Sequence, residues 1–134
     1  MPEPDIIPIS ASIASTGKGI RYIGNWIYAM SGAVSVDNSQ ITMNSFTTGS
    51  GLIVCKWTPG YAAESTDNMI FRVSFNAIQV YRVTLDGRLV NSPFQWVELI
   101  IPPETTVLVN CEDKTGAGPI QMSSNFTGRV YGAV

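Results

Sequence analysis

The sequence predicts an all-β domain: an antiparallel β-sandwich, most consistent with a jelly roll, with an extended N-terminal arm. Three observations support this fold class. Short runs rich in Val, Ile, Thr and aromatic residues recur along the chain, and such runs favour strands. Turn-forming residues separate them, which gives about eight strands. No segment shows the sustained 3.6-residue periodicity of a helix.

The chain has 134 residues, which is the size of one domain. We divide it into an arm, residues 1–19, and a single sandwich domain, residues 20–134. The arm begins with three prolines among its first eight residues and continues as SASIASTGKG, a composition unsuited to a helix.

The arm is too apolar for a disordered tail, so we expect it to lie against something. It either adds an edge strand to its own sheet or docks on a neighbouring chain. The candidate subunit-interface residues are Pro4, Ile6, Ile7 and Ile9.

The clearest strand is MIFRVSF, residues 69–75, in which inward and outward positions alternate. One face is predicted to carry Met69, Phe71, Val73 and Phe75, which is typical of a half-buried antiparallel strand. The same alternation can continue through Tyr81, Val83 and Leu85. The intervening NAI, residues 76–78, is then either a tight turn or a bulge. After it, Asp86-Gly87 is suited to a two-residue hairpin.

Two apolar runs, FQWVELII and TTVLVN, flank Pro102-Pro103. Each run has the length and β-branched composition of one strand. Two consecutive prolines cannot donate ladder hydrogen bonds, so they end the first strand. In a sandwich, such a corner is where the chain leaves one sheet and crosses to the other.

The remaining strands are predicted from the same patterns. The closing segment IQMSSNFTGRVYG places Ile120, Met122, Phe126 and Val130 on one face. Earlier candidates are NWIYAMSGAVSV, QITMNSF and LIVCKWT.

The low charge of the chain bears on its partners. Charged residues make up 13% of the sequence and the net charge is −2, so the surface is mostly neutral and favours close packing with other subunits. Lys and Arg are not clustered, which argues against nucleic acid as a partner. No apolar run approaches a membrane span and the N-terminus lacks a signal-peptide pattern, so we expect synthesis in the cytoplasm and no membrane partner.

Two cysteines, Cys55 and Cys111, lie outside any metal-binding or thioredoxin-type spacing. We expect buried thiols. The alternative is a bridge between two strand faces, and a reducing compartment argues against it.

Catalysis is not predicted. The chain contains no His, which removes the commonest general base and most catalytic zinc sites. Two carboxylate pairs, Glu98 with Asp86 and Glu112 with Asp113, were considered for acid-base work, and we expect them in solvated loops. The segments ESTDN (64–68) and EDK (112–114) lack the regular ligand spacing of a calcium loop. We therefore predict no metal and no cofactor.

The aromatic residues could form a sugar-stacking platform or fill the core. Core is the expectation for Trp57. For Trp26 and Trp96 either face is possible, and an exposed pair would mark a ligand-stacking or subunit contact.

With the strands laid out, the second half of the chain resembles virion structural proteins of bacterial viruses, tailed and tailless, that adopt jelly-roll or related sandwich folds. The resemblance covers residues 69–134 and rests on the order of VTLDGRLV, LIIPPETTVLV and TGRVYG. It implies assembly without catalysis, in a virion, as a minor capsid, decoration or cement protein. The partners would be copies of the chain and other capsid proteins. The alternative function is a carbohydrate-binding or host-attachment module on the same fold, with Trp26 or Trp96 stacking on a glycan.

Overall fold

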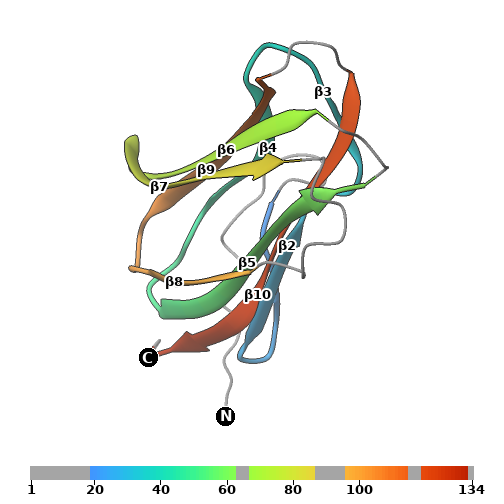
Figure 1. Cartoon of the computed structure of the whole chain (residues 1–134). Helices are drawn as coiled ribbons and strands as arrows, with labels where there is room; N and C mark the ends of the chain where they lie inside the picture. The colour runs from blue at the N-terminus through green and yellow to red at the C-terminus, as the bar shows by residue number, and fades with distance from the viewer. Residues whose placement is uncertain (1–18, 63–66, 87–95, 115–118, 133–134) are drawn as a thin grey trace.

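The computed structural model describes residues 19–62, 67–86, 96–114 and 119–132. These residues form ten strands and no helix (Figure 1). In chain order the strands are β1 (Arg21–Ile23), β2 (Trp26–Met30), β3 (Val34–Val36), β4 (Ile41–Thr47), β5 (Leu52–Tyr61), β6 (Asn68–Phe75), β7 (Ile78–Asp86), β8 (Val97–Ile101), β9 (Thr106–Asp113) and β10 (Ile120–Tyr131). The described residues thus include no helix that could cross a membrane. The arm candidates Pro4, Ile6, Ile7 and Ile9 lie outside the described residues.

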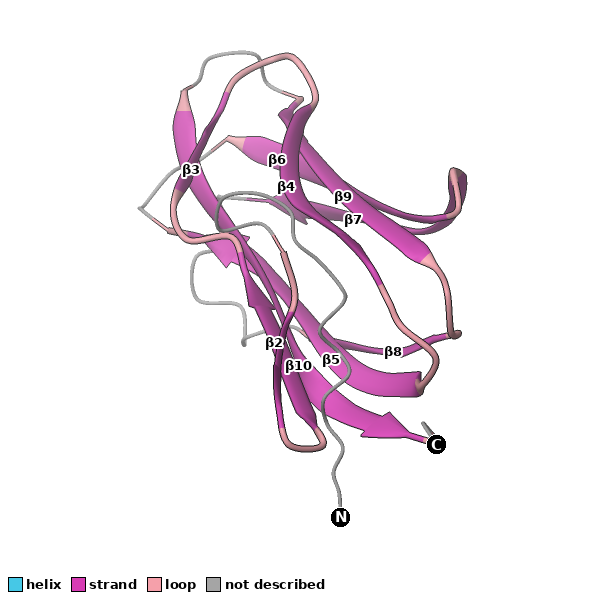
Figure 2. Ribbon diagram, turned by 180° about the vertical axis from the view of Figure 1, so that it is seen from behind, coloured by secondary structure: helices cyan, strands magenta, loops and turns pink. Residues whose placement is uncertain are grey.

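The strands make two packed antiparallel sheets, seen from opposite sides in Figures 1 and 2. Sheet A has the order β1-β2-β10-β5-β8, with β3 also pairing with β10, and sheet B has the order β4-β9-β6-β7. With the short β1 and β3 set aside, β2-β10-β5-β8 faces β4-β9-β6-β7, which is the strand order of an eight-stranded jelly roll. The predicted fold class is confirmed.

The double proline ends one strand, and the chain crosses to the other sheet after it, as predicted. β8 ends at Ile101 in sheet A, and β9 begins at Thr106 in sheet B. Glu104, between them, has a φ of 53°, a left-handed conformation that turns the chain sharply. The connection that follows β4 makes the reverse crossing, from sheet B to sheet A.

Thr48 joins the two crossings. Its hydroxyl donates a hydrogen bond to the carbonyl of Pro102 (2.9 Å) and accepts one from the backbone N–H of Thr105 (2.9 Å). The backbone N–H of Thr48 also donates to the carbonyl of Thr105. Both threonines are 2% exposed, so these bonds satisfy polar groups that water does not reach.

At residues 76–78, where the sequence left a tight turn or a bulge open, the structure has the turn, and a bulge lies further along β7. Asn76 and Ala77 have φ values of 51° and 70°, as a two-residue hairpin turn requires. The pairing also shifts between Val73 and Ser74, which leaves Val80 of β7 without an opposite residue and makes a bulge. Beyond the bulge, Tyr81 lies opposite Val73, so the predicted alternation continues into β7.

The hairpin predicted at Asp86-Gly87 extends into residues 87–95, which lie outside the described part of the chain. Within the described part, β7 pairs with β6 alone, and the next strand, β8, belongs to the other sheet.

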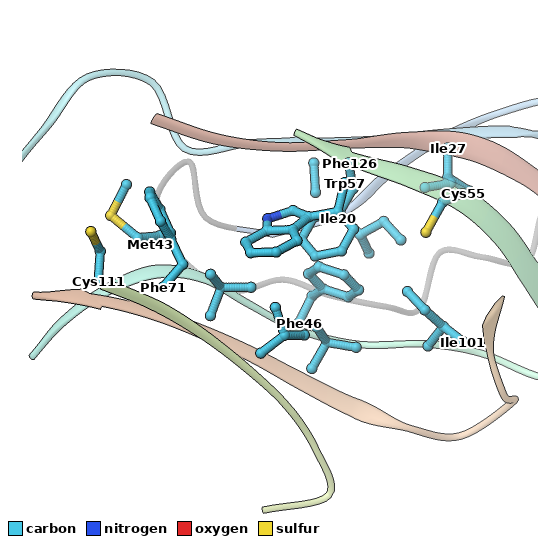
Figure 3. Packing of buried hydrophobic residues seen from close by; sticks show 14 of the residues in the cluster. Ile20, Ile27, Met43, Phe46, Cys55, Trp57, Phe71, Ile101, Cys111 and Phe126 are labelled. Atoms are coloured by element: carbon cyan, nitrogen blue, oxygen red, sulfur yellow. The ribbon is translucent and has the colours of Figure 1, made fainter. Parts of the chain in front are cut away.

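The core fills the space between the sheets, with Trp57 near its centre (Figure 3). The inward sides of β6 and β10 supply Met69, Phe71, Val73, Met122 and Phe126, all fully buried as predicted. The rings of Phe71 and Phe126 contact Trp57 at centroid distances of 5.8 and 6.4 Å. Trp57 is therefore a core residue.

The indole N–H of Trp57, inside the core, has a hydrogen-bond partner. The Trp57 Nε1–H donates to Ser124 Oγ (2.8 Å), and that hydroxyl donates to Asn44 Oδ1 (2.5 Å). Both Ser124 and Asn44 are fully buried. These two consecutive hydrogen bonds link three strands, β5, β10 and β4, across the two sheets.

The cysteines are free and buried, as expected. They lie toward opposite ends of the core in Figure 3. Burial raises the pKa of each thiol to about 12, so both are unreactive near neutral pH in the folded protein.

Candidate functional site

The outer face of sheet A, opposite the core, is the most distinctive surface in the described part of the molecule. Strand alternation places every second residue there, and antiparallel pairing aligns these residues in rows across the sheet. One row crosses five strands: Ile23, Trp26, Arg129, Val54 and Ile100. The next row is Arg21, Tyr28, Thr127, Lys56 and Glu98. We call this surface the sheet-A face.

Large apolar side chains are exposed mainly on the sheet-A face. Of the ten such residues in the described part, seven lie on this face or at its rim: Ile23, Trp26, Met30, Leu52, Trp96, Ile100 and Tyr131. The other three, Ile78, Val80 and Tyr81, lie together on β7. The most exposed residues of the face are Ile23 at 62% and Ile100 at 60%.

Both candidate tryptophans, Trp26 and Trp96, lie at this surface, exposed by 57% and 47%. Trp26 opens β2, and Trp96 directly precedes β8. The strand order β2-β10-β5-β8 separates them by three strand spacings, about 14 Å across the sheet. They therefore belong to one broad surface and do not flank a single ligand-sized site.

Cationic side chains cover these rings. Arg129 lies over Trp26, with its guanidinium carbon 4.7 Å from the ring centroid, and also approaches Tyr131 at 5.7 Å. Lys56 Nζ lies 4.3 Å from the centroid of Trp96. Each contact is a cation–π interaction. It places the long apolar stem of the cationic residue beside an aromatic ring, which enlarges the continuous contact surface.

The charges of the face also set it apart. Arg21, Lys56 and Arg129 face outward with one acid, Glu98, a balance of three positive charges against one. The whole chain carries a net charge of −2. The sheet-A face is therefore a positive, aromatic surface on a weakly acidic protein, and a neutral or acidic partner surface would complement it.

The opposite outer face, on sheet B, has a different character. Its central rows contain an ion pair between Arg72 and Glu112, 2.5 Å apart, each about three-quarters buried. Thr47 and Thr106 form a hydrogen-bonded pair at its edge. Substitutions on this face can therefore serve as controls for substitutions on the sheet-A face.

The expectation that both acid pairs lie in solvated loops is wrong for Glu112 and Asp113. Glu112 and Asp113 were expected in a solvated loop, but both lie in β9, on opposite faces of the strand, and Asp113 is only 2% exposed. At this end of β9, the N–H of Asp113 donates to the carbonyl of Asp37, and its side chain hydrogen-bonds with that of Asp67, so two other segments of the chain contact it. Glu98 is exposed in β8, and Asp86 ends β7 in the other sheet, so that pair shares no strand pairing.

The two segments considered for calcium do approach each other. The N–H of Lys114 donates to the carbonyl of Asn68, and the side chain of Asp67 hydrogen-bonds with that of Asp113, which raises the pKa of Asp67. Residues 63–66 of the first segment lie outside the described part. Among the described residues, no cluster of three or more acidic, Cys or His ligands has the arrangement of a metal site.

The sequence singled out Trp26 and Trp96 but missed the rest of the sheet-A face. Ile23, Arg129 and Ile100 become neighbours only through pairing between strands that are far apart in the sequence. In comparisons with known proteins, the sequence matches no family model and no curated protein.

Proposed function

We propose that the protein is a structural subunit that acts by assembly, as a minor capsid, decoration or cement protein of a virion. The observation that carries the proposal is the sheet-A face, with its seven exposed large apolar side chains. Soluble monomers rarely expose a large contiguous apolar surface unless it binds something. Trp, Tyr and Arg, which lie side by side here, are the residue types that contribute most at protein interfaces.

The virion setting rests on two supports. The first is the resemblance of residues 69–134 to virion structural proteins. The second is the jelly-roll strand order, an architecture that many viral capsid proteins use. Fold alone does not determine function, so the assembly role is argued from the face itself.

The same geometry favours a subunit contact over a glycan-stacking site. A sugar ring stacks on an open aromatic face, and here Arg129 and Lys56 each occupy a face of Trp26 and Trp96. The two rings are also too far apart to hold one sugar between them. A flat partner surface, in contrast, can contact both tryptophans and the row between them at once.

The test is the molar mass of the full chain in solution, measured by light scattering over a concentration series. We expect a closed oligomer for the wild type, and a shift to the 14.5 kDa monomer for Trp26→Ser and Ile100→Ser. Both side chains are exposed, so these variants should fold normally. Leu108→Ser removes an apolar side chain at a half-buried position on the outer side of sheet B and should leave the oligomer intact wherever the variant stays folded.

Two results would contradict the proposal. A wild-type chain that is monomeric at every concentration would remove self-assembly, and a glycan array would then test the carbohydrate-binding alternative. Equal loss of assembly in Leu108→Ser would show that the sheet-A face has no special role.

A further inference from the structure

The outer edge of β7 is a long strand edge without a partner in the described structure. β7 closes sheet B and pairs only with β6. It has nine residues, about 30 Å of strand, and every residue from Ile78 to Arg82 is exposed. In Figure 1 the β6–β7 hairpin projects at the left of the molecule.

The other sheet edges are better protected. β1 has three residues and β8 has five, so each offers little ladder to a new strand. β4, at the other end of sheet B, is mostly buried or half-buried. Proteins usually protect open edges by such means. Among the described residues, β7 is protected only by its bulge and by Arg82, so of the described edges this one is suited to accept another strand.

The charge on β7 indicates what kind of strand fits. Arg82 lies directly opposite Arg72 on β6, and like charges in that position repel. Arg72 is neutralised by Glu112. For Arg82, no described carboxylate lies within ion-pair distance. An acidic residue on an incoming strand would supply the missing partner.

Residues 2–9 of this chain, PEPDIIPI, have the pattern that such an edge requires. In an extended strand, successive residues direct their N–H and C=O groups to alternate sides and their side chains to alternate faces. All three prolines occupy even positions: Pro2, Pro4 and Pro8. One edge of the strand therefore keeps every N–H group, on the odd-numbered residues, while the prolines are confined to the other edge.

The side chains follow the same alternation. The even-numbered residues, Pro2, Pro4, Ile6 and Pro8, are all apolar, and the acids Glu3 and Asp5 are both odd-numbered. When the odd-numbered backbone groups face β7, the odd-numbered side chains lie on the outer side, with Glu3 and Asp5 beside Arg82. Ile7 and Ile9 then lie along the same face, and the even-numbered apolar set faces the core. There it would contact Tyr81, Val83 and Leu85, which are only partly covered at the open rim of the sandwich.

We propose that residues 2–9 of one copy pair as an added strand with the outer edge of β7 of a second copy. The proposal rests on the proposed assembly function and adds a second contact between neighbouring subunits to that of the sheet-A face. The described chain begins at Gly19, next to β1 at one edge of sheet A, whereas β7 is an edge of sheet B. The proline-bearing edge faces solvent after pairing, so no further strand can add to it.

A pair of proline substitutions in the full chain tests the backbone alternation. Ile7→Pro removes an N–H that faces β7, and we expect the dissociation constant of the assembly to rise about tenfold or more. Ile6→Pro removes an N–H that faces solvent and keeps an apolar inward side chain, so assembly should be unchanged. Both positions precede Gly19, the first described residue. Equal effects of the two substitutions would overturn the proposal.

A photo-crosslink tests whether the acceptor belongs to a second copy. A benzophenone amino acid is placed at Val80, which is exposed on β7, and the full-length variant is mixed with ¹⁵N-labelled wild-type chains. Mass spectrometry should find unlabelled β7 joined to labelled peptides from residues 1–18. Crosslinks confined to one isotope would show that the arm returns to its own chain, and crosslinks to other segments would show that it does not bind β7; either result overturns the proposal.

The two proposals fail in different ways. Loss of assembly in Ile100→Ser, with no difference between Ile6→Pro and Ile7→Pro, would leave the sheet-A face as the interface and remove the β7 contact. Mixed-isotope crosslinks, together with intact assembly in Ile100→Ser and Trp26→Ser, would support the β7 contact and remove the sheet-A face as the interface.

Discussion

The hydroxyl of Thr48 accepts a 2.9 Å hydrogen bond from the backbone N–H of Thr105, its partner across the corner of the sandwich. The same hydroxyl donates to the carbonyl of Pro102. It therefore fastens the two connections that cross between the sheets, one before β5 and one after β8. The double proline ends β8, and the hydrogen bonds of Thr48 fix the backbone between β8 and β9.

Thr48→Val should destabilise the domain, because it leaves the buried N–H of Thr105 without its acceptor. We expect a loss of about 1–3 kcal/mol in the free energy of unfolding, measured by urea denaturation. Thr48→Ser keeps the hydroxyl and should recover most of the loss. If Thr48→Ser costs as much as Thr48→Val, the hydrogen bonds of the hydroxyl do not account for the loss of stability.

Gly128 has no room for a side chain. A Cβ at this position in β10 would lie 2.2 Å from the carbonyl oxygen of Val54 and 2.5 Å from Cα of Cys55. Because these are backbone atoms of the paired strand, they cannot move aside without opening the β5–β10 ladder. Gly128→Ala should therefore cost about 3 kcal/mol or more, or prevent folding.

Gly60 is the matched control for that substitution. It lies in β5 of the same sheet, and a Cβ there would meet nothing within 4 Å. Gly60→Ala should leave the unfolding midpoint nearly unchanged. A similar loss for both glycines would mean that the close approach at Gly128 is not the cause.

Ser124 is expected to matter more than its neighbour Ser123. Ser124→Ala removes the acceptor of the Trp57 Nε1–H and the donor to Asn44 Oδ1, both inside the core. Each orphaned group should cost about 1–3 kcal/mol. Ser123 points to the other face of β10, and Ser123→Ala should change the free energy of unfolding by less than about 0.5 kcal/mol. Both free energies of unfolding are measured by urea denaturation. Equal changes for Ser124→Ala and Ser123→Ala would rule out a stabilising role for the buried hydrogen bonds of Ser124.

The strands could be predicted from the sequence because alternation and turn chemistry are local. MIFRVSF contains its own inward and outward faces, and Pro102-Pro103 stops a strand wherever it occurs. The number of strands was underestimated because the short β1 was not predicted and because NWIYAMSGAVSV divides into β2 and β3, separated by a bend in which Gly32 has a φ of 70°. A single run of residues does not reveal such a break.

The sheet-A face and the burial of Asp113 could not be predicted in the same way. Trp26 could lie on either side of β2, and only the pairing of β2 with β10 places Arg129 beside it. Asp113 is polar and follows another acid, so its sequence neighbourhood favours solvent. In the fold it contacts two distant segments, through its N–H to Asp37 and through its side chain to Asp67, and contacts of this range depend on the whole topology.

The carboxyl groups at that end of the sandwich predict two opposite pH dependences. The hydrogen bond with Asp113 raises the pKa of Asp67 above its ordinary value of 3.8, so the folded state holds this proton more tightly than the unfolded chain. The contribution to stability is fully present below pH 3.8 and is lost as the pH rises through the raised pKa. Asp37 behaves in the opposite sense, because hydrogen bonds from the side chain and backbone of Ser39 lower its pKa.

Asp67→Asn and Asp37→Asn should therefore have effects of opposite sign at pH 7. An amide at position 67 donates permanently to Asp113, so Asp67→Asn should raise the free energy of unfolding, with the gain shrinking as the pH falls through the raised pKa of the wild-type carboxyl. Asp37→Asn removes a charge that the folded state stabilises, so it should lower the free energy of unfolding at pH 7, and the loss should fade below pH 3.8. Urea denaturation from pH 3 to pH 8 measures both differences. A destabilised Asp67→Asn at neutral pH would contradict the idea that a permanent donor at position 67 stabilises the contact with Asp113.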